Sequence, residues 1–267
     1  MNMKPLILFD WDNTIADGTA QINDQRFKAV IQTKIGEGWW VGLNSDTPLK
    51  RLQSWWKSLE MNGPIVAEKG AVIWWPNAQE TRVSQTSEIF SALRKDVTLL
   101  LAQTSEIGLF VGDSTEFIKS VKEIIGRDSI FVALDAYRVC SLGLFARQIK
   151  DGLLLKDSAT AEKIRDLITP LLPNHPLVSP IDLNLEHCFM SVNSLDADKT
   201  TGVRVLLERW GMASEVIMVG DSMADYLKLP QVRHFAVGNA QPAFREKADR
   251  IATKNYTEGC VELLSTI

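Results

Sequence analysis

The chain contains few of the residues that build disulfide frameworks or zinc centres. Among its 267 residues are three cysteines and three histidines. Cys140, Cys188 and Cys260 lie far apart and show no Cys-x-x-Cys spacing, which is unlike a disulfide scaffold and suits a reducing cytosol. The histidines show no spacing typical of metal ligands, which argues against zinc. We therefore expect a cytoplasmic protein without a zinc site.

Long apolar runs and basic clusters are also missing. No apolar stretch approaches the ~20 residues of a membrane span, and the N-terminal residues lead into a very short apolar run, unlike a secretory signal peptide. The net charge is −4, and no run of Lys or Arg is present that would bind a polyanion. We expect neither a membrane nor a nucleic acid as partner. A hydrophobic content of 45% is that of a soluble globular protein of one large or two modest domains.

Tryptophan, in contrast, is frequent. Six of the eight tryptophans form adjacent pairs. The pairs are Trp39-Trp40, Trp55-Trp56 and Trp74-Trp75. Packing of large amphipathic side chains at strand ends and helix faces is the favoured interpretation, and a stacking platform for a ligand is the alternative.

The most informative stretch is a short apolar run that ends in two carboxylates. The run 6–9 is typical of a buried strand, and Asp10 and Asp12 follow it, before Asn13 and Thr14. In open α/β sheets, ligands bind just beyond the carboxyl ends of the strands. Carboxylates buried there need a cation or hydrogen-bond donors. Because Asp-x-Asp-Asn is also common in turns, this stretch alone leaves a purely structural interpretation open.

Two parts of the chain show an alternation of strands and helices. This pattern predicts a parallel sheet with helical crossovers, as in a doubly wound, Rossmann-like α/β fold. The expected helices are 24–35, 49–60, 198–210, 242–247 and 260–264, and the expected strands are 6–9, 39–43, 64–68, 71–75, 215–219, 234–237 and 250–252.

The middle of the chain has a different pattern. Strands joined by short turns there predict antiparallel pairing. The expected helices are 82–102, 115–125 and 158–172, and the expected strands are 130–134, 137–148, 177–181 and 185–192. We therefore expect a discontinuous α/β core, 1–77 with 189–267, and an inserted α+β domain, 78–188.

Polar residues gather at several expected strand ends of the core. Since the carboxyl ends of parallel strands share one edge of the sheet, these residues can converge. Several carboxylates without a cation would repel each other, and an oxygen-only ligand set favours Mg²⁺. The residues are Asp10 and Asp12, Asn44 and Ser45, Asp221 and Asp225, and Lys199 at the start of a helix.

This combination fits phosphoryl transfer. A carboxylate can act as the nucleophile and form an aspartyl-phosphate, and a second acid can protonate the leaving oxygen and then activate water. A lysine and a helix N-terminus stabilise phosphoryl charge. Asn44 and Ser45 precede the expected helix 49–60, so they are candidate phosphate ligands, although they are also good helix caps. Gly112-Asp113-Ser114 repeats the sequence at 220–222, but no second carboxylate follows at the same spacing, and we expect no site there.

The same residues resemble the motifs of haloacid dehalogenase superfamily phosphatases. Asp10-Trp11-Asp12-Asn13-Thr14 matches the first motif, Asp-x-Asp-x-Thr, and Lys199 matches the third-motif lysine. Residues 220–225 match the fourth motif, Gly-Asp-x-x-x-Asp. At the second motif, where a Ser or Thr usually binds the phosphoryl group, Asn44 takes that place by register and Ser45 follows. The chain resembles the branch of this superfamily in which a C2-type cap domain is inserted between the second and third motifs.

The resemblance implies a role for each matching residue. Asp10 would be the nucleophile and a metal ligand, and Asp12 the general acid/base, with its backbone carbonyl on the metal. Asp221 and Asp225 would complete the Mg²⁺ site, and Lys199 would bind the phosphoryl group. The implied reaction is Mg²⁺-dependent hydrolysis of a small phosphate ester, with the inserted domain as a cap.

Two further segments are similar to the Cof-like, phosphoglycolate and sucrose-phosphate phosphatases. They are 65–71 and 237–240, the latter followed by Lys247-Ala248-Asp249. Lys69 and Ala224 stand where these proteins usually have Asn. In the expected cap, Arg138 and Ser141 are candidates for contacting the organic part of the substrate, and ordinary exposed strand residues are the alternative.

Three other functions share part of this pattern. A phosphomutase uses the same aspartyl-phosphate but returns the phosphoryl group to a sugar. A receiver-like signalling module also phosphorylates an Asp, but it needs no insertion of this size, and a non-catalytic binding protein is the third alternative. The sequence leaves the substrate open among phosphoglycolate, a hexose phosphate and a sugar-phosphate conjugate, and it leaves monomer and homodimer open.

Overall fold

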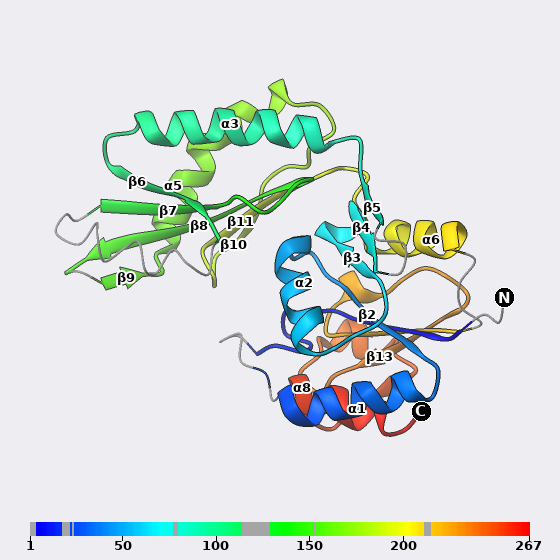
Figure 1. Ribbon diagram of the computed structural model, residues 1–267. Coiled ribbons are helices and arrows are strands. Elements are labelled where there is room, and N and C mark those ends of the chain that lie inside the picture. Colours follow the sequence, from blue (N-terminus) through cyan, green and yellow to red (C-terminus); the bar gives the residue numbers. More distant parts are fainter. Residues whose placement is uncertain are drawn as a thin grey trace. The chain divides into compact units, whose positions relative to one another are not determined.

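The computed structural model describes residues 4–17, 22, 24–76, 80–113, 129–151, 153–210 and 215–267 (Figure 1). The chain forms two compact units. The first unit joins Met1–Arg82 with Ala197–Ile267, and the second is Val83–Asp196. The second unit is therefore an insertion into the first.

The first unit is built on an eight-stranded sheet with the order β14-β13-β12-β1-β2-β3-β4-β5. Strand β1 lies in its interior, parallel to β12 on one side and to β2 on the other. The chain winds outward from β1 in both directions, which places a topological switch point at the end of this strand. The strands are β1 (Leu6–Phe9), β2 (Trp40–Asn44), β3 (Ile65–Ala67), β4 (Val72–Trp75), β5 (Glu80–Val83), β12 (Val216–Gly220), β13 (Val232–Ala236) and β14 (Arg250–Ile251).

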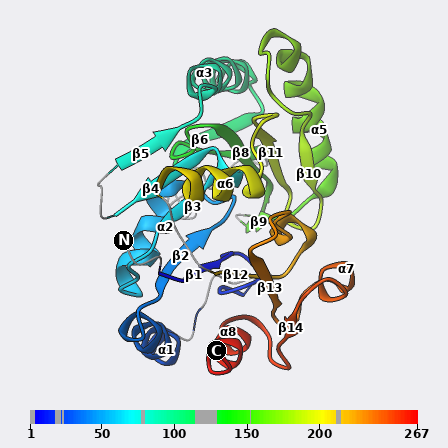
Figure 2. The ribbon, with the colours of Figure 1, turned by 90° about the vertical axis from the view of Figure 1, so that its right-hand side faces the viewer.

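Helices cover both faces of this sheet. Because side chains of a strand alternate between faces, Leu6 and Leu8 pack in a cluster with α6, whereas Phe9 meets Phe27 of α1 edge to face at 5.4 Å. Helices α1 and α8 lie side by side (Figures 1 and 2). The doubly wound α/β fold is thus confirmed. The helices are α1 (Asp24–Gly36), α2 (Leu49–Ser58), α6 (Lys199–Trp210), α7 (Pro242–Arg245) and α8 (Tyr256–Leu264).

The hairpin β3–β4 departs from the expected parallel sheet. Ile65 of β3 pairs antiparallel with Trp74 of β4. The connection is the short 3₁₀ turn η1 (Glu68–Gly70), whose three residues have positive φ angles of 49°, 55° and 95°. A turn this short can only reverse the chain, because a parallel pair needs a crossover of a dozen or more residues.

The second unit has a six-stranded sheet with the order β10-β11-β8-β7-β6, and β9 pairs with β8. Pairs β7/β8, β8/β11 and β10/β11 are antiparallel, as expected, but β6 and β7 are parallel. The strands are β6 (Ile107–Gly112), β7 (Ser129–Asp135), β8 (Ser141–Lys150), β9 (Leu153–Leu155), β10 (Asp182–Asn184) and β11 (Phe189–Asn193).

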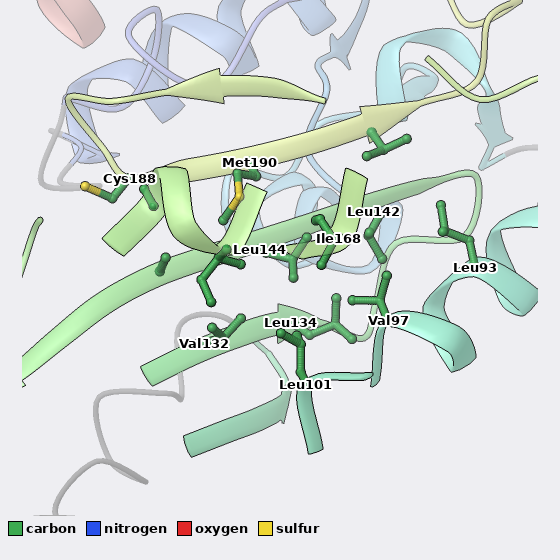
Figure 3. Close-up of a cluster of buried hydrophobic side chains, with 14 of the residues drawn as sticks. Leu93, Val97, Leu101, Val132, Leu134, Leu142, Leu144, Ile168, Cys188 and Met190 are labelled. Atoms are coloured by element: carbon green, nitrogen blue, oxygen red, sulfur yellow. The ribbon is translucent and has the colours of Figure 1, made fainter. Parts of the chain in front are cut away.

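Two helices bury one face of this second sheet. Helix α3 (Ser87–Gln103) contributes Leu93, Val97 and Leu101, and α5 (Ser158–Ile168) contributes Ile168 to one apolar cluster with strands β7, β8 and β11 (Figure 3). All members of this cluster are almost inaccessible to solvent. The second unit therefore has a core of its own, as an inserted domain requires.

Several expected elements of the second unit are wrong. Strand β5 occupies the start of the expected helix 82–102, β6 was not expected, and residues 177–181 form no strand of the sheet. Strand β11 pairs with β8, so the insertion extends to Asp196 instead of ending at 188, and it begins at Val83 instead of 78. Sequence pattern alone does not show which sheet a buried strand joins. The expected helix 115–125 lies outside the described residues.

Candidate active site

Three acidic side chains converge at the carboxyl ends of β1 and β12. Asp10 follows β1, and Asp221 and Asp225 follow β12. One oxygen of each carboxylate lies within 4.8 Å of the others, and all three residues are buried. They meet because β1 and β12 are parallel neighbours, and the backbone N–H of Asp10 donates to the carbonyl of Val219 at 2.9 Å.

Lys199, the first residue of α6, places a cation among these carboxylates. Its Nζ donates to Oδ1 of Asp10 at 2.8 Å and to Oδ1 of Asp225 at 2.6 Å. Burial by itself lowers the pKa of Lys199, but the two carboxylates outweigh burial and raise it. The ammonium group is therefore held charged, as a binder of an anion must be.

Asp225 organises the loop after β12. Its Oδ2 accepts hydrogen bonds from the backbone N–H groups of Asp221 at 3.0 Å and Ser222 at 3.1 Å, which directly precede the 3₁₀ turn η3 (Met223–Asp225). Gly220 has no room for a side chain, since a Cβ there would lie 2.4 Å from the Asp225 carboxylate. One oxygen of Asp225 thus shapes the loop and the other faces Lys199.

The protonation of Asp10 and Asp221 is strongly perturbed. Burial, and then the charge of Asp225, raise the pKa of Asp221 to about 7, although Lys199 and a 3.4 Å hydrogen bond from Thr14 Oγ1 oppose this. Burial also raises the pKa of Asp10 well above its usual value, against the opposing charge of Lys199. A cluster of buried carboxylates with one lysine lacks positive charge, and perturbed pKa values of this kind gather at functional sites.

The donor set fits Mg²⁺. Asp10, Asp221 and Asp225 offer carboxylate oxygens only, which are ligands that this hard cation prefers. A divalent ion would also supply the positive charge that the cluster lacks. The side chain of Asp12 lies outside this group of three.

Asp12 has a different environment from Asp10. It is exposed, and its Oδ2 accepts a 3.0 Å hydrogen bond from Oγ1 of Thr47. Thr47 belongs to the polar run 44–47 before α2, whose residue types suit phosphate ligands or helix caps and give no local sign of a contact with Asp12. No side chain among the described residues caps α2, whose N-cap is Pro48. The Thr47 hydroxyl turns to Asp12 instead.

Asn44 and Ser45 lie at the end of β2, and both are fully buried. The Asn44 amide nitrogen lies 3.7 Å from Sδ of Met218, and Oδ1 of Asn44 has no hydrogen-bond partner among the described residues. The Ser45 hydroxyl accepts the backbone N–H of Thr47 at 3.3 Å. Phosphate binding by either residue therefore stays a prediction.

The loop after β1 is held from the other side by Asn239. Asn13 adopts a left-handed backbone with φ of 61°, which Asn tolerates better than most residues. Its carbonyl accepts a 2.7 Å hydrogen bond from Nδ2 of Asn239, whose Oδ1 accepts the N–H of Tyr256 at 2.9 Å. The segment 237–240, noted in the sequence for its resemblance, thus supports the loop that carries Asp12.

Arg138 and Ser141 belong to the second unit and are buried there. Nη1 of Arg138 donates to Oγ of Ser141 at 3.1 Å, and its Nε lies 3.9 Å from Oδ2 of Asp135. The two residues therefore form one cluster inside the second unit. Contact with a substrate stays a prediction for both.

Comparison with known families agrees with this geometry. Residues 7–264 match the family of haloacid dehalogenase-like hydrolases. The protein belongs to this family. Among relatives of known name, the phosphoglycolate phosphatase of Staphylothermus marinus is 27% identical over 125 residues, which are 46% of this chain and 50% of that protein. The match thus spans half the length of that protein.

Solved structures of the family share the fold over nearly the whole chain. A haloacid dehalogenase-like hydrolase from Bacteroides thetaiotaomicron superposes with a TM-score of 0.68 at 19% identity, covering 98% of this chain and 99% of that one. A haloacid dehalogenase-like hydrolase from B. subtilis gives 0.62 at 14% identity, covering 98% and 99%. At such low identity the likeness establishes the fold, and the chemistry has to be argued from the site.

Proposed function

We propose that this hydrolase is a Mg²⁺-dependent phosphatase of small phosphorylated metabolites that works through an aspartyl-phosphate. The observation that carries the proposal is the position of Asp10. Asp10 directly follows the interior strand β1. Its carboxylate contacts the ammonium group of Lys199 and lies beside the carboxylates of Asp221 and Asp225. A nucleophilic carboxylate that attacks an anionic group needs positive charge nearby, which Lys199 supplies and which a cation held by the carboxylates would increase.

In the first half-reaction, a carboxylate oxygen of Asp10 attacks phosphorus. The bond between phosphorus and the ester oxygen breaks, and Asp12 gives its proton to that oxygen, which leaves as an alcohol. Lys199 binds a phosphoryl oxygen and stabilises the charge that develops on it. Asp12 suits its role because it is exposed and follows Asp10 by two positions, a spacing that places both side chains on the same side where the backbone is extended.

In the second half-reaction, water hydrolyses the aspartyl-phosphate. Asp12, now ionised, takes a proton from the water while the water oxygen attacks phosphorus. The bond between phosphorus and the Asp10 oxygen breaks, inorganic phosphate leaves, and both carboxyl groups return to their starting states. Each bond that forms is matched by one that breaks, so no further reactant is needed.

Asp10, Asp221, Asp225 and the backbone carbonyl of Asp12 would hold the Mg²⁺ ion. When bound, the ion would offset the negative charge of the carboxylates and of the phosphoryl group. The raised pKa of Asp221 supports this assignment, because it reflects missing positive charge, and a cation that binds the carboxylate displaces its proton into the solvent.

We propose the second unit as a cap that excludes bulk water and selects the substrate. Its own core and its insertion between β5 and α6 support this role. The phosphoglycolate phosphatase among the relatives favours a small substrate of that kind, and a sugar phosphate is the alternative. Arg138 and Ser141 are the substrate contacts that we propose in this unit.

The test is release of phosphate from p-nitrophenyl phosphate and from a panel of phosphorylated metabolites, with Mg²⁺ and with EDTA. We expect metal-dependent release by the wild type and none by Asp10→Asn, which keeps the shape but removes the nucleophile. Asp166→Asn, at an exposed carboxylate of α5, is the matched control and should behave as the wild type. Undiminished release by Asp10→Asn would overturn the mechanism. Transfer of phosphate to a sugar in place of release would identify a phosphomutase.

A further inference from the structure

We infer that Thr47 is a positioning residue that orients the Asp12 carboxylate for proton transfer. This inference rests on the proposed function, since it assigns a task within that reaction. The contact that suggests it joins two residues 35 positions apart: Oγ1 of Thr47 donates to Oδ2 of Asp12 at 3.0 Å. Asp12 is exposed, whereas Thr47 is buried, with 3% of its surface exposed.

The backbone holds the Thr47 hydroxyl in place. The N–H of Thr47 donates to Oγ of Ser45 at 3.3 Å, and its carbonyl accepts the N–H of Glu68 at 3.3 Å. Pro48 follows directly and restricts Thr47 to extended backbone conformations. The branched Cβ of threonine limits its rotamers further. The hydroxyl is therefore fixed before any substrate arrives.

A hydroxyl group suits both protonation states of Asp12. It carries one donor and two acceptor lone pairs. It donates to Oδ2 of Asp12 when the carboxylate is ionised, and it can donate to the same oxygen when the transferable proton is on Oδ1. The same contact therefore persists while Asp12 alternates between general acid and general base. Geometry of this kind matters because proton transfer is efficient only within hydrogen-bond reach of the reacting oxygen.

The experiment compares Thr47→Val with Thr47→Ser on substrates with different leaving groups. Valine keeps the shape of threonine without the hydroxyl, and serine keeps the hydroxyl. An alkyl phosphate needs protonation of its leaving oxygen, whereas p-nitrophenolate leaves without it. For Thr47→Val we expect kcat/KM to fall about 10- to 100-fold on alkyl phosphates and less than about threefold on p-nitrophenyl phosphate. Thr47→Ser should restore most of the alkyl phosphate activity.

A double-mutant comparison tests whether Thr47 acts through Asp12. In the background of Asp12→Asn, Thr47→Val should change kcat/KM by less than about twofold, because the group that it positions is gone. Thermal unfolding of each variant checks folding, and Thr47→Ala replaces Thr47→Val if valine prevents folding. A further large loss in the Asp12→Asn background would overturn the inference.

Two other results separate this inference from the proposed function. Equal losses on alkyl and p-nitrophenyl phosphates, without rescue by serine, would show that Thr47 only supports the fold. The wild type and Asp10→Asn, measured alongside, report on the function itself. If the wild type releases no phosphate from any ester, the proposed function fails and the inference falls with it.

Discussion

The indole rings of Trp11 and Trp55 stack face to face, with centroids 3.6 Å apart and planes inclined by 7°. Trp11 stands between Asp10 and Asp12, and Trp55 belongs to α2, the helix that directly follows Thr47 and Pro48. Trp11 is almost fully buried, so it serves packing, as the alternation of an extended segment predicts. The stack joins the segment that carries the two proposed reactive carboxylates to helix α2.

The first prediction concerns this stack. Trp55→Ala should lower the free energy of unfolding by roughly 2–3 kcal/mol, somewhat less than for a fully buried aromatic side chain, because Trp55 is half-buried. Trp55→Phe, which keeps an aromatic ring, should lose less than half of that amount. Urea denaturation followed by circular dichroism measures both. Equal losses for alanine and phenylalanine would show that the ring contact is not what stabilises the segment.

The second prediction concerns Lys199. Lys199→Met leaves the carboxylates of Asp10 and Asp225 buried without their cation, which typically costs about 3–5 kcal/mol. We expect this loss in urea denaturation at pH 8 with EDTA, and a smaller loss with Mg²⁺. Phosphatase activity should fall at least about 100-fold.

The control for Lys199 is an exposed ion pair. Lys163 pairs with Glu106 at 2.9 Å, and both side chains are more than half exposed. Lys163→Met should therefore change stability by less than about 1 kcal/mol. Similar effects of the two substitutions would contradict a special role for the buried lysine.

The third prediction concerns pH and metal binding. The pKa of Asp221 is raised from 3.8 to about 7 in the folded protein. Between these values the folded protein holds a proton that the unfolded chain has lost, so the metal-free protein should lose stability as pH rises through this window. Because Mg²⁺ requires ionised Asp221, its affinity should increase up to about pH 7 and then level off.

Thermal unfolding measures this pH dependence. The increase in Tm caused by Mg²⁺ should be larger at pH 8 than at pH 6, and Asp221→Asn should remove most of the difference. An increase of the same size at both pH values would refute the assignment of Asp221 as a metal ligand that titrates near neutrality.

The fourth prediction concerns the close approach of α6 to η1. A Cβ on Gly202 would lie 2.6 Å from Cα of Gly70 and 2.8 Å from Cγ1 of Val66. Gly202→Ala should therefore destabilise the protein by about 1–3 kcal/mol, although alanine favours helices, and should reduce activity because α6 carries Lys199.

Gly36 is the matched control for Gly202. It ends helix α1, and a Cβ there would meet nothing within 4 Å. Gly36→Ala should be neutral or slightly stabilising in the same denaturation experiment. If Gly202→Ala were equally neutral, the contact between Gly202 and Gly70 would not set the distance between α6 and the hairpin β3–β4.

Much of the first unit could be predicted from the sequence because its signals are local. A buried strand such as β1 is a short apolar run, and the carboxylates that follow it in sequence also follow it in space. The parallel arrangement of β1 beside β12 then brings Asp10 to Asp221, as the β/α alternation predicts. The second unit was harder, because β6 was not expected, β10 has only three residues, and β11 could have extended either sheet.

The sequence by itself determined the residue types of the site and the strand ends that carry them: Asp10 and Asp12 after one apolar run, Asp221 and Asp225 after another. Tertiary structure decided which groups touch. In the folded protein Asp225 accepts hydrogen bonds both from Lys199 and from the loop after β12, and the Thr47 hydroxyl donates to Asp12. A strand pattern determines at which strand end a residue lies. A hydrogen bond, however, depends on distances of a few ångströms between segments that are far apart in the sequence, and only packing brings these segments together.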